Sequence, residues 1–245
     1  MPCWVLCGFA AALILLLAPP QRPAQAQRLG TAAGPDVQAG DLSAEARGGI
    51  APDNGAATVR LHLQRAFNER VRLRGIVFGR DRGRDRDAFG FSYGEAQLLL
   101  QTTESGGTGG YAAAVRLDAR YRNGGAPHQF GLNWLHELTF GARWRARTGV
   151  YLNRDIGENP PGGITFETRS SVSRRLPDGL RLHLTLIDDF GRSTRFGGFH
   201  DQQHQLGPTL SGRLGQGWDW AVRGLFGLSR QANDVEFSLR LDYAF

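Results

Sequence analysis

The last eleven residues of the chain alternate between apolar and polar side chains with a period of two. The apolar or aromatic members of this alternation are Val235, Phe237, Leu239, Leu241, Tyr243 and Phe245. Such a pattern predicts a β-strand with one apolar face and one polar face. The pattern continues to the final residue, whereas the end of a soluble domain usually frays. We therefore expect the C-terminus to be a strand of a larger sheet.

This ending resembles the C-terminal assembly signal of Gram-negative outer-membrane β-barrel proteins. The residues that carry the resemblance are Phe237, Leu239, Leu241, Tyr243 and Phe245. The resemblance implies a closed antiparallel up-and-down transmembrane β-barrel in the cell outer membrane. It also implies contact with outer-membrane lipid and lipopolysaccharide, and with the barrel-assembly machinery through the C-terminal strand. In detail it covers this one strand, and it identifies neither a subfamily nor an activity.

The first 26 residues have the pattern of a secretory signal peptide. The apolar run from Phe9 to Ala18 is too short to span a bilayer as a helix, and Ala24-Gln25-Ala26 has the small-x-small pattern of a cleavage site. We expect export through the periplasm and cleavage after Ala26; an uncleaved membrane anchor is the alternative. Cys3 and Cys7 are the only cysteines, so the mature chain would have neither disulfides nor cysteine-metal chemistry.

The basic side chains of the chain are all arginine, and the formal net charge is +6. A basic balance is found in nucleic-acid-binding proteins, where basic residues gather in patches. Here the arginines alternate with apolar residues along expected strands, and the chain is exported, so we expect no nucleic-acid partner. A charged pore lining, or contact with anionic lipopolysaccharide, suits this pattern better.

Alternation continues along most of the chain after residue 55, interrupted by turn residues. The predicted strands are 57–67, 70–79, 90–101, 111–121, 128–138, 143–153, 163–174, 180–190, 204–214, 218–228 and 235–245. Single-chain bacterial barrels almost always have an even number of strands. We therefore expect about twelve, with a further strand within residues 27–55, or ten as the alternative. At Gly207-Pro208 we expect a bulge or a late strand start, since proline cannot donate to a strand ladder.

The expected domain organisation is a signal peptide (1–26), a periplasmic N-terminal tail (27–55) and a barrel (56–245). A short helical turn is expected near Leu42 to Arg47. With the C-terminus in the periplasm, the connections should alternate between long outside and short inside. Most do, although the link 102–110 falls inside and is not short.

The apolar faces of these strands are expected to point into lipid. Aromatic residues recur near strand ends, as in the interfacial girdles of membrane barrels, and the opposite faces are too polar for a packed core. A soluble β-sandwich, which also alternates, is the alternative. The arginines expected to line the lumen and to influence selectivity are Arg116, Arg120, Arg143, Arg145, Arg147, Arg169, Arg181, Arg213, Arg223 and Arg240.

Two sets of residues are candidates for chemistry. His183, Thr185 and Asp189 share a strand face and could form a nucleophilic set, although hydrogen-bonded lumen residues would look the same. The segment 191–203 holds His200 and Asp201, with His204 directly after it. These three residues could bind a metal, but a loop that narrows the pore, or a plain surface loop, explains them as well. We predict neither a metal, a cofactor nor a catalytic site.

The function predicted from the sequence is a passive, porin-like channel for small solutes with a basic lumen. A structural or surface-interaction barrel whose lumen is plugged by ion pairs is the second hypothesis, because barrels of this size need not conduct. The third is a lipid-modifying outer-membrane enzyme built around His183. The sequence does not indicate which solute or partner is involved.

Overall fold

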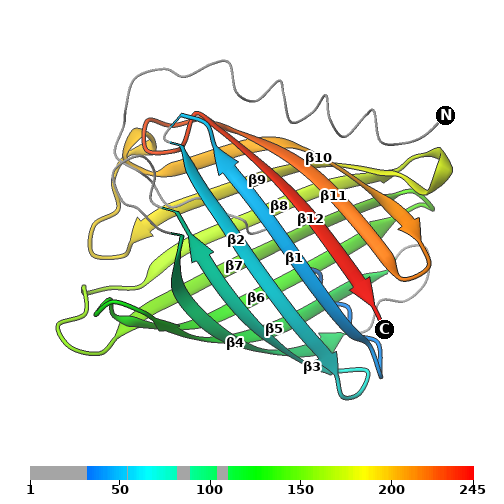
Figure 1. Cartoon of the computed structure of the whole chain (residues 1–245), viewed down its shortest axis with the longest axis horizontal. Coiled ribbons are helices and arrows are strands. Elements are labelled where there is room, and N and C mark those ends of the chain that lie inside the picture. The colour runs from blue at the N-terminus through cyan, green and yellow to red at the C-terminus, as the bar shows by residue number, and fades with distance from the viewer. Residues whose placement is uncertain (1–31, 54, 82–88, 104–109) are drawn as a thin grey trace.

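The computed structural model describes residues 32–53, 55–81, 89–103 and 110–245. The predicted signal peptide, its cleavage site and both cysteines lie outside these residues. The described chain is almost entirely strand (Figure 1). The strands are β1 (Leu42–Ala51), β2 (Ala56–Ala66), β3 (Val71–Arg80), β4 (Gly90–Thr103), β5 (Tyr111–Arg122), β6 (His128–Phe140), β7 (Trp144–Ile156), β8 (Thr165–Arg175), β9 (Arg181–Arg192), β10 (Gln203–Gly215), β11 (Trp218–Gly227) and β12 (Val235–Ala244).

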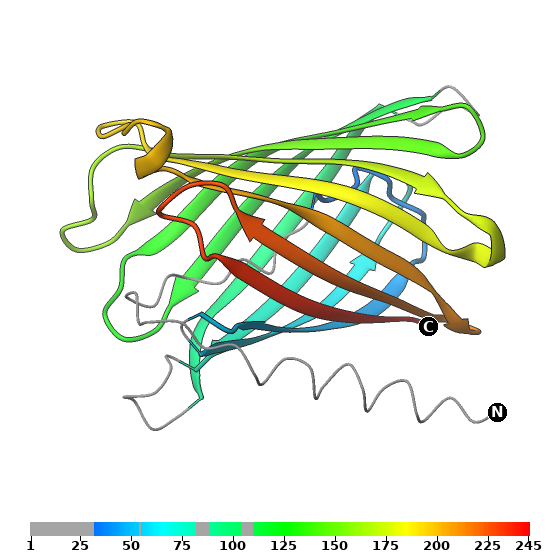
Figure 2. The ribbon, with the colours of Figure 1, turned by 90° about the horizontal axis from the view of Figure 1, so that it is seen from above.

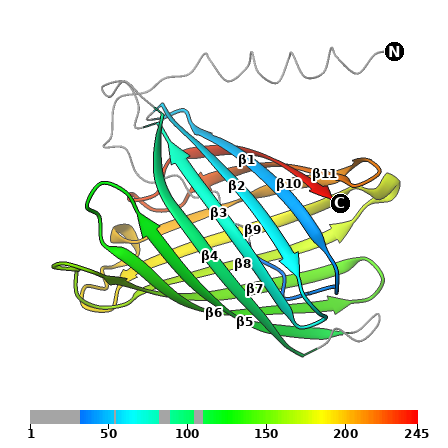
Figure 3. The same cartoon turned by 60° about the horizontal axis from the view of Figure 1, so that its bottom comes forward.

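The twelve strands form one closed antiparallel barrel. Each strand pairs with its neighbours in sequence, and β1 pairs with β12 from Ser43↔Ala244 to Ile50↔Phe237, which closes the sheet (Figures 1 and 3). Closure leaves no unpaired edge, which is the condition for a sheet in hydrocarbon. The predicted fold class is confirmed, and so is the count of twelve. The eleven strand ranges predicted individually agree with the structure to within three residues at each end.

The twelfth strand is β1, and it corrects the predicted domain boundary. The barrel begins at Leu42 and not at residue 56, and the helical turn expected near Leu42 to Arg47 is wrong because these residues are extended. The lipid-side positions of β1 include Ala44, Ala46 and Gly48. Because these side chains are small, β1 lacks the alternation of large apolar residues that reveals the other strands.

The two rims of the barrel differ in their connections (Figure 2). What we call the C-terminal rim holds the C-terminus and the links 67–70, 104–110, 141–143, 176–180 and 216–217. The opposite rim holds the links 52–55, 81–89, 123–127, 157–164, 193–202 and 228–234. Most links of the opposite rim are longer, as the sequence predicted, and 104–110 remains the exception on the C-terminal rim.

Strand β10 passes through Pro208 without a change of register. It begins at Gln203, and its pairing with β9 runs continuously through Pro208↔Leu184. The expected bulge or late start is therefore wrong. The ladder to β11 has no pair at Gly207 and Pro208, so the missing N–H of proline falls where no partner is required. A Cβ atom at Gly207 would lie 1.8 Å from the carbonyl oxygen of Gly224, so glycine allows this close approach.

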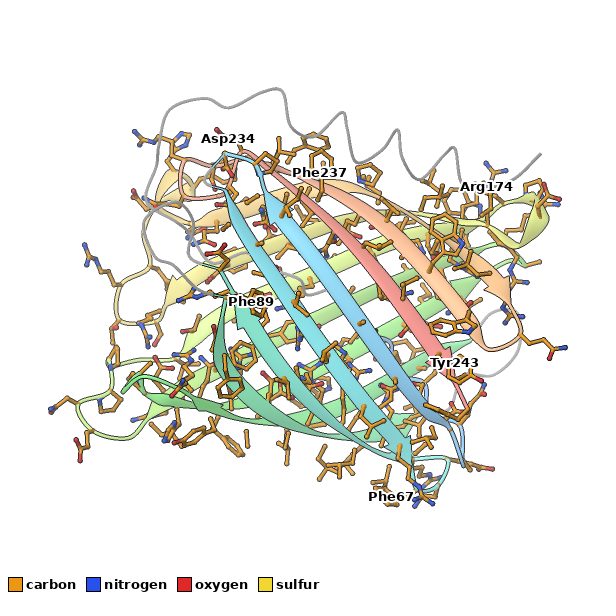
Figure 4. All side chains as sticks on the ribbon, in the orientation of Figure 1. Phe67, Phe89, Arg174, Asp234, Phe237 and Tyr243 are labelled. Carbon is orange, nitrogen blue, oxygen red and sulfur yellow. The ribbon has the colours of Figure 1, made fainter. Side chains whose placement is uncertain are left out.

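The outer face of the barrel is apolar and the inner face is polar. Side chains exposed on the outside include Val59, Leu61, Leu63, Phe130, Leu132, Trp134, Leu182, Leu184, Phe237 and Leu239. Tyr111, Tyr121, Trp144 and Trp218 lie near strand ends and are also exposed. Figure 4 shows the outward sticks, with Phe67 and Tyr243 near the C-terminal rim. Buried charged residues alternate with these positions, an inside-out arrangement that a soluble sandwich does not have. In the described part of the chain, no helix is long and apolar enough to cross a membrane.

Residues 32–41, called here the inner segment, lie before β1 and enter the lumen from the C-terminal rim. Val37 is buried against Leu99, Ala114, Leu135 and Tyr151, which face inward from four successive strands. The Val37 amide donates to Gln101 Oε1 (2.8 Å), and Arg72 Nη1 donates to the Asp36 carbonyl (3.1 Å). This part of the predicted periplasmic tail thus lies inside the barrel, where its small residues fit between the inward side chains.

Candidate functional site

The larger cavity of the lumen has a volume of about 560 Å³. Its lining comes from β1 to β9, from the inner segment through Ala33, and from the link after β5. The charged residues of its lining are Arg47, Arg60, Arg74, Arg80, Arg116, Arg120, Arg122, Arg169, Arg192, Glu95, Asp118, Glu167 and Asp189. Alternation along each strand places these side chains on one face, and closure of the sheet makes them face each other.

Carboxylates of the larger cavity are paired with arginines. Arg116 donates two hydrogen bonds to Asp118, of 2.8 and 2.7 Å, and Asn133 donates a third of 2.7 Å. Glu95 accepts a hydrogen bond of 2.6 Å from Arg120 Nε. Arg169 pairs in the same way with Glu167. Arginine forks bind carboxylates with defined geometry, so these pairs fix the inner wall.

Aromatic rings hold several of these arginines in place. The guanidinium carbon of Arg120 lies 4.3 Å from the centre of the Tyr93 ring. Tyr151, which is buried, has Arg169 at 4.7 Å and Arg116 at 5.3 Å from its ring centre. Contacts of this kind restrain a cation without neutralising it. The arginines therefore keep their charge at defined positions on the wall.

Glu137 forms a further ionic cluster beside the inner segment. Its carboxylate lies 3.0 Å from Arg145 Nε and 2.6 Å from Arg147 Nε, and Glu137 is only 2% exposed. A Cβ atom placed on Gly34 would lie 2.8 Å from Arg147 Nη2, so the inner segment passes directly over this arginine. The cluster thus ties the wall of β6 and β7 to the segment that fills part of the lumen.

The smaller cavity has a volume of about 60 Å³ and lies against β7 to β12 and β1. Ala32 of the inner segment forms part of its boundary. The polar residues of its lining are Arg47, Arg147, Arg223, Arg240, His183, Ser171, Thr185, Thr209, Ser211 and Ser238. Most of its wall is therefore arginine and hydroxyl groups, because the inner faces of these strands are rich in serine and threonine.

The predicted lumen arginines fall into four groups. Arg116, Arg120 and Arg169 line the larger cavity, and Arg147, Arg223 and Arg240 line the smaller one. Arg145 and Arg181 line neither cavity but contact inner-face residues, Glu137 and Ser173 respectively. Arg143 lies exposed in the turn before β7, and the Arg213 side chain is 83% exposed at the C-terminal rim, 3.6 Å from Asp219. Arg213 keeps the inward parity of β10 but lies near the end of that strand, where the barrel no longer encloses it, and Arg143 precedes the first residue of β7.

Several lining arginines were not predicted from the sequence. They are Arg47, Arg60, Arg74, Arg80, Arg122 and Arg192. Extending the inner-face alternation through β2, β3 and the end of β5 would have found Arg60, Arg74 and Arg122. Arg47 could not be found because its strand was not recognised.

The structure does not assemble the nucleophilic set considered for β9. His183 and Asp189 are six residues apart on one strand, which corresponds to roughly 20 Å at about 3.3 Å per residue. His183 Nε2 instead lies 3.1 Å from Ser211 Oγ on β10. Both residues line the smaller cavity inside the barrel, away from the outer face that would meet lipid.

The link 193–202 is fixed to the outer face of the barrel. Its short 3₁₀ turn, Phe199–Asp201, places the Phe199 ring parallel to the His204 ring, with centres 4.4 Å apart. His204 Nδ1 lies 2.7 Å from Asp188 Oδ1. Both side chains point outward, because they alternate along β10 and β9 with residues that point into the lumen. The described residues of this link line neither cavity, which favours the plain surface loop over a loop folded into the pore. In the described chain, no three His, Cys, Asp or Glu residues are grouped as a metal site.

Comparison with solved structures agrees with this architecture. One similar structure is a KdgM porin, with a TM-score of 0.61 and 8% identity, covering 83% of this chain and 99% of the other. Another is the COG4313 outer membrane channel from Pseudomonas putida F1, with a TM-score of 0.68 and 9% identity, covering 90% of this chain and 100% of the other. No model of a protein family matches the sequence, and no curated protein matches it either.

The chain therefore has the fold of porin-type outer-membrane β-barrels, as the C-terminal strand predicted. This fold implies the outer membrane as its location. At identities of 8 and 9% the likeness concerns the fold alone, and the subfamily is not identified.

Proposed function

We propose that the protein is a passive outer-membrane channel for small hydrophilic solutes and that it prefers anions. One observation carries this proposal: nine arginines but four carboxylates line the larger cavity. Arg116, Arg120 and Arg169 each have a carboxylate partner in this lining, whereas Arg47 pairs with Glu45, and Arg122 and Arg192 pair with Asp155, behind it. With these two further carboxylates counted, nine arginines still face six carboxylates. An excess of positive charge inside low-dielectric walls raises the local concentration of anions.

The size of the barrel is consistent with passage of small solutes only. Eight strands enclose a lumen that side chains fill, whereas porins with an aqueous channel have 16 to 18. A twelve-stranded barrel lies between, and here the inner segment takes up part of the lumen. In this proposal solutes pass beside the inner segment, within the space of the larger cavity.

The orientation and route to the membrane are also part of the proposal. The signal peptide is cleaved after Ala26, and the barrel-assembly machinery binds the C-terminal strand. The C-terminal rim then faces the periplasm, while the opposite rim, with most of the longer links, faces the cell exterior and lipopolysaccharide. Short periplasmic turns and longer extracellular loops are the usual pattern of such barrels.

Planar-bilayer recording of the purified barrel tests the function. Under a KCl gradient, we expect discrete conductance steps and a reversal potential with the sign of chloride preference. A barrel without steps, or one with a strong cation preference, would contradict the proposal.

A plugged barrel without transport is the second candidate, and the inner segment favours it. Val37 packs into an apolar cluster on the wall, and Gly34 passes over Arg147. If this segment never leaves, the ionic clusters would serve stability or surface interaction. A full-length protein that does not conduct, together with a variant lacking residues 32–38 that does, would identify this plugged barrel.

A further inference from the structure

The smaller cavity differs from the rest of the lumen in the charges that surround it. Four arginines and five hydroxyl side chains line it, together with His183, Ala32 and Ala221, and no carboxylate is among the described residues of its wall. The larger cavity, by contrast, has carboxylates among its arginines. A cavity that collects donors and positive charge without a carboxylate has the composition of an anion site.

Two arginines of this wall, Arg147 and Arg240, keep donors available for a ligand. Arg147 and Arg240 pair through Nε with Glu137 and Asp242, at 2.6 and 2.8 Å, and these carboxylates are not part of the cavity wall. A guanidinium carries five N–H donors, so an ion pair through Nε leaves others for the cavity. The pairs therefore orient the two arginines without neutralising the cavity itself.

Thr209 is the second, independent sign of a ligand. It is 8% exposed, lines the smaller cavity, and its hydroxyl oxygen has no hydrogen-bond partner among the described residues. Buried hydroxyl groups are normally hydrogen-bonded, since an unsatisfied one has lost its hydrogen bonds to water without replacement. Thr209 faces Arg223 on β11 and His183 on β9 in register, so an anion there would meet all three strands.

The volume of the cavity limits what it can hold. A water needs about 10–15 Å³ of such space. The cavity, at about 60 Å³, is therefore large enough for a few heavy atoms only. A small oxyanion such as phosphate fits this limit, and its oxygens accept hydrogen bonds from both hydroxyls and arginines.

We infer that the smaller cavity is a binding site for one small oxyanion, with free inorganic phosphate as its representative. Thr209 donates a hydroxyl hydrogen bond to it, and Arg223 and Arg240 supply charge. The inference rests on the proposed function in one respect, since an anion-permeable lumen is its route of entry. Bound there, the anion would also lie beside Ala32, and so against the inner segment.

Calorimetric titration of the detergent-solubilised mature protein with phosphate tests the site. We expect saturable binding of one phosphate per chain, weakened roughly tenfold in Thr209→Val, which removes one hydrogen bond to a charged group. Thr58→Val is the matched control, because Thr58 is a buried inner-face threonine outside both cavity walls. Its phosphate affinity should equal that of the unmodified protein.

Two outcomes would overturn the site: no saturable binding at millimolar phosphate, or equal loss of affinity in both variants. Glucose 6-phosphate distinguishes a free ion from a phosphoryl group on a larger solute. Free phosphate should bind at least tenfold more tightly, and tighter binding of the sugar phosphate would contradict the assignment. Anion conductance without phosphate binding would refute this site alone, whereas phosphate binding without conductance would refute the channel alone.

Discussion

Arg147 donates a hydrogen bond of 2.6 Å to Glu137 across the paired strands β6 and β7, on the inner face of the barrel. Glu137 is almost completely buried, and Arg145 lies 3.0 Å from its other oxygen. One carboxylate is thus shared by two arginines, and the second of these lies against Gly34 of the inner segment. This cluster places charge in the lumen, links β6 to β7, and contacts the segment that fills part of the lumen.

Arg147→Ala should change ion selectivity without unfolding the barrel. Glu137 keeps Arg145 as a partner, so we expect the free energy of unfolding to fall by only about 1–3 kcal/mol. The preference for chloride should decrease because one lumen charge is lost. Reversal potentials and denaturant unfolding in detergent measure the two effects. Arg213→Ala, at an exposed rim position, should change neither. Unfolding or leakage with unchanged selectivity would favour the plugged barrel.

Removal of residues 32–38 should increase the single-channel conductance severalfold. These residues place Val37 and Ala33 against the inner wall, so their loss opens space that solutes can cross. The barrel should remain folded, since β1 begins only at Leu42. Planar-bilayer recording of the shortened and full-length proteins provides the comparison. Equal, very small conductance in both would show that ion pairs close the lumen, as the structural hypothesis holds.

The wall of the barrel could be predicted from the sequence because its physical cause is local. Large outward residues such as those of β6 and β12 repeat with period two against polar inward residues, and this pattern is visible without tertiary structure. Strand β1 was missed as an element because Ala44, Ala46 and Gly48 on its lipid side give almost no alternation. Only the requirement for an even strand number pointed to it.

The site was predicted less completely, because it depends on what closure brings together. Strand parity correctly predicted that Arg116 and Arg223 point into the lumen. It could not predict where along a strand the lumen ends, and Arg213 lies beyond that point, exposed at the rim. The pairing of His183 with Ser211 depends on the β9–β10 register, which the sequence does not specify. The inner segment shows no periodic pattern of apolar residues. Its position inside the lumen depends on the packing of Val37 against residues that are distant in the sequence.

Leu61→Arg should destabilise the barrel in lipid. Leu61 lies near the middle of β2, is 52% exposed on the outer face, and would place a charge near the bilayer midplane. The expected loss is about 2–4 kcal/mol, measured by denaturant unfolding in phospholipid vesicles. Phe67→Arg, at the C-terminal rim, is the control and should cost only about 0–1 kcal/mol. Equal small effects at both positions would mean that this face does not meet hydrocarbon.

Phe245→Ala should lower the amount of folded barrel in the outer membrane. The Phe245 amide donates to the Leu42 carbonyl (3.0 Å), but its side chain is exposed and contacts Tyr243, so its loss removes little packing. Assembly should therefore suffer more than stability. Membrane fractionation measures the first, and refolding in detergent the second. Phe130→Ala, another exposed aromatic, should leave assembly unchanged. Normal membrane levels of Phe245→Ala would contradict the assembly role of the C-terminal strand.

Quenching of Trp134 fluorescence by lipids brominated on their acyl chains tests the inside-out arrangement most directly. Trp134 lies midway along β6 and is 51% exposed on the outer face. In a variant whose other tryptophans are replaced by phenylalanine, we expect strongest quenching when the bromines lie near the bilayer centre. Fluorescence that brominated lipid leaves unchanged, in a protein that stays soluble and monomeric without detergent, would contradict the membrane-spanning barrel.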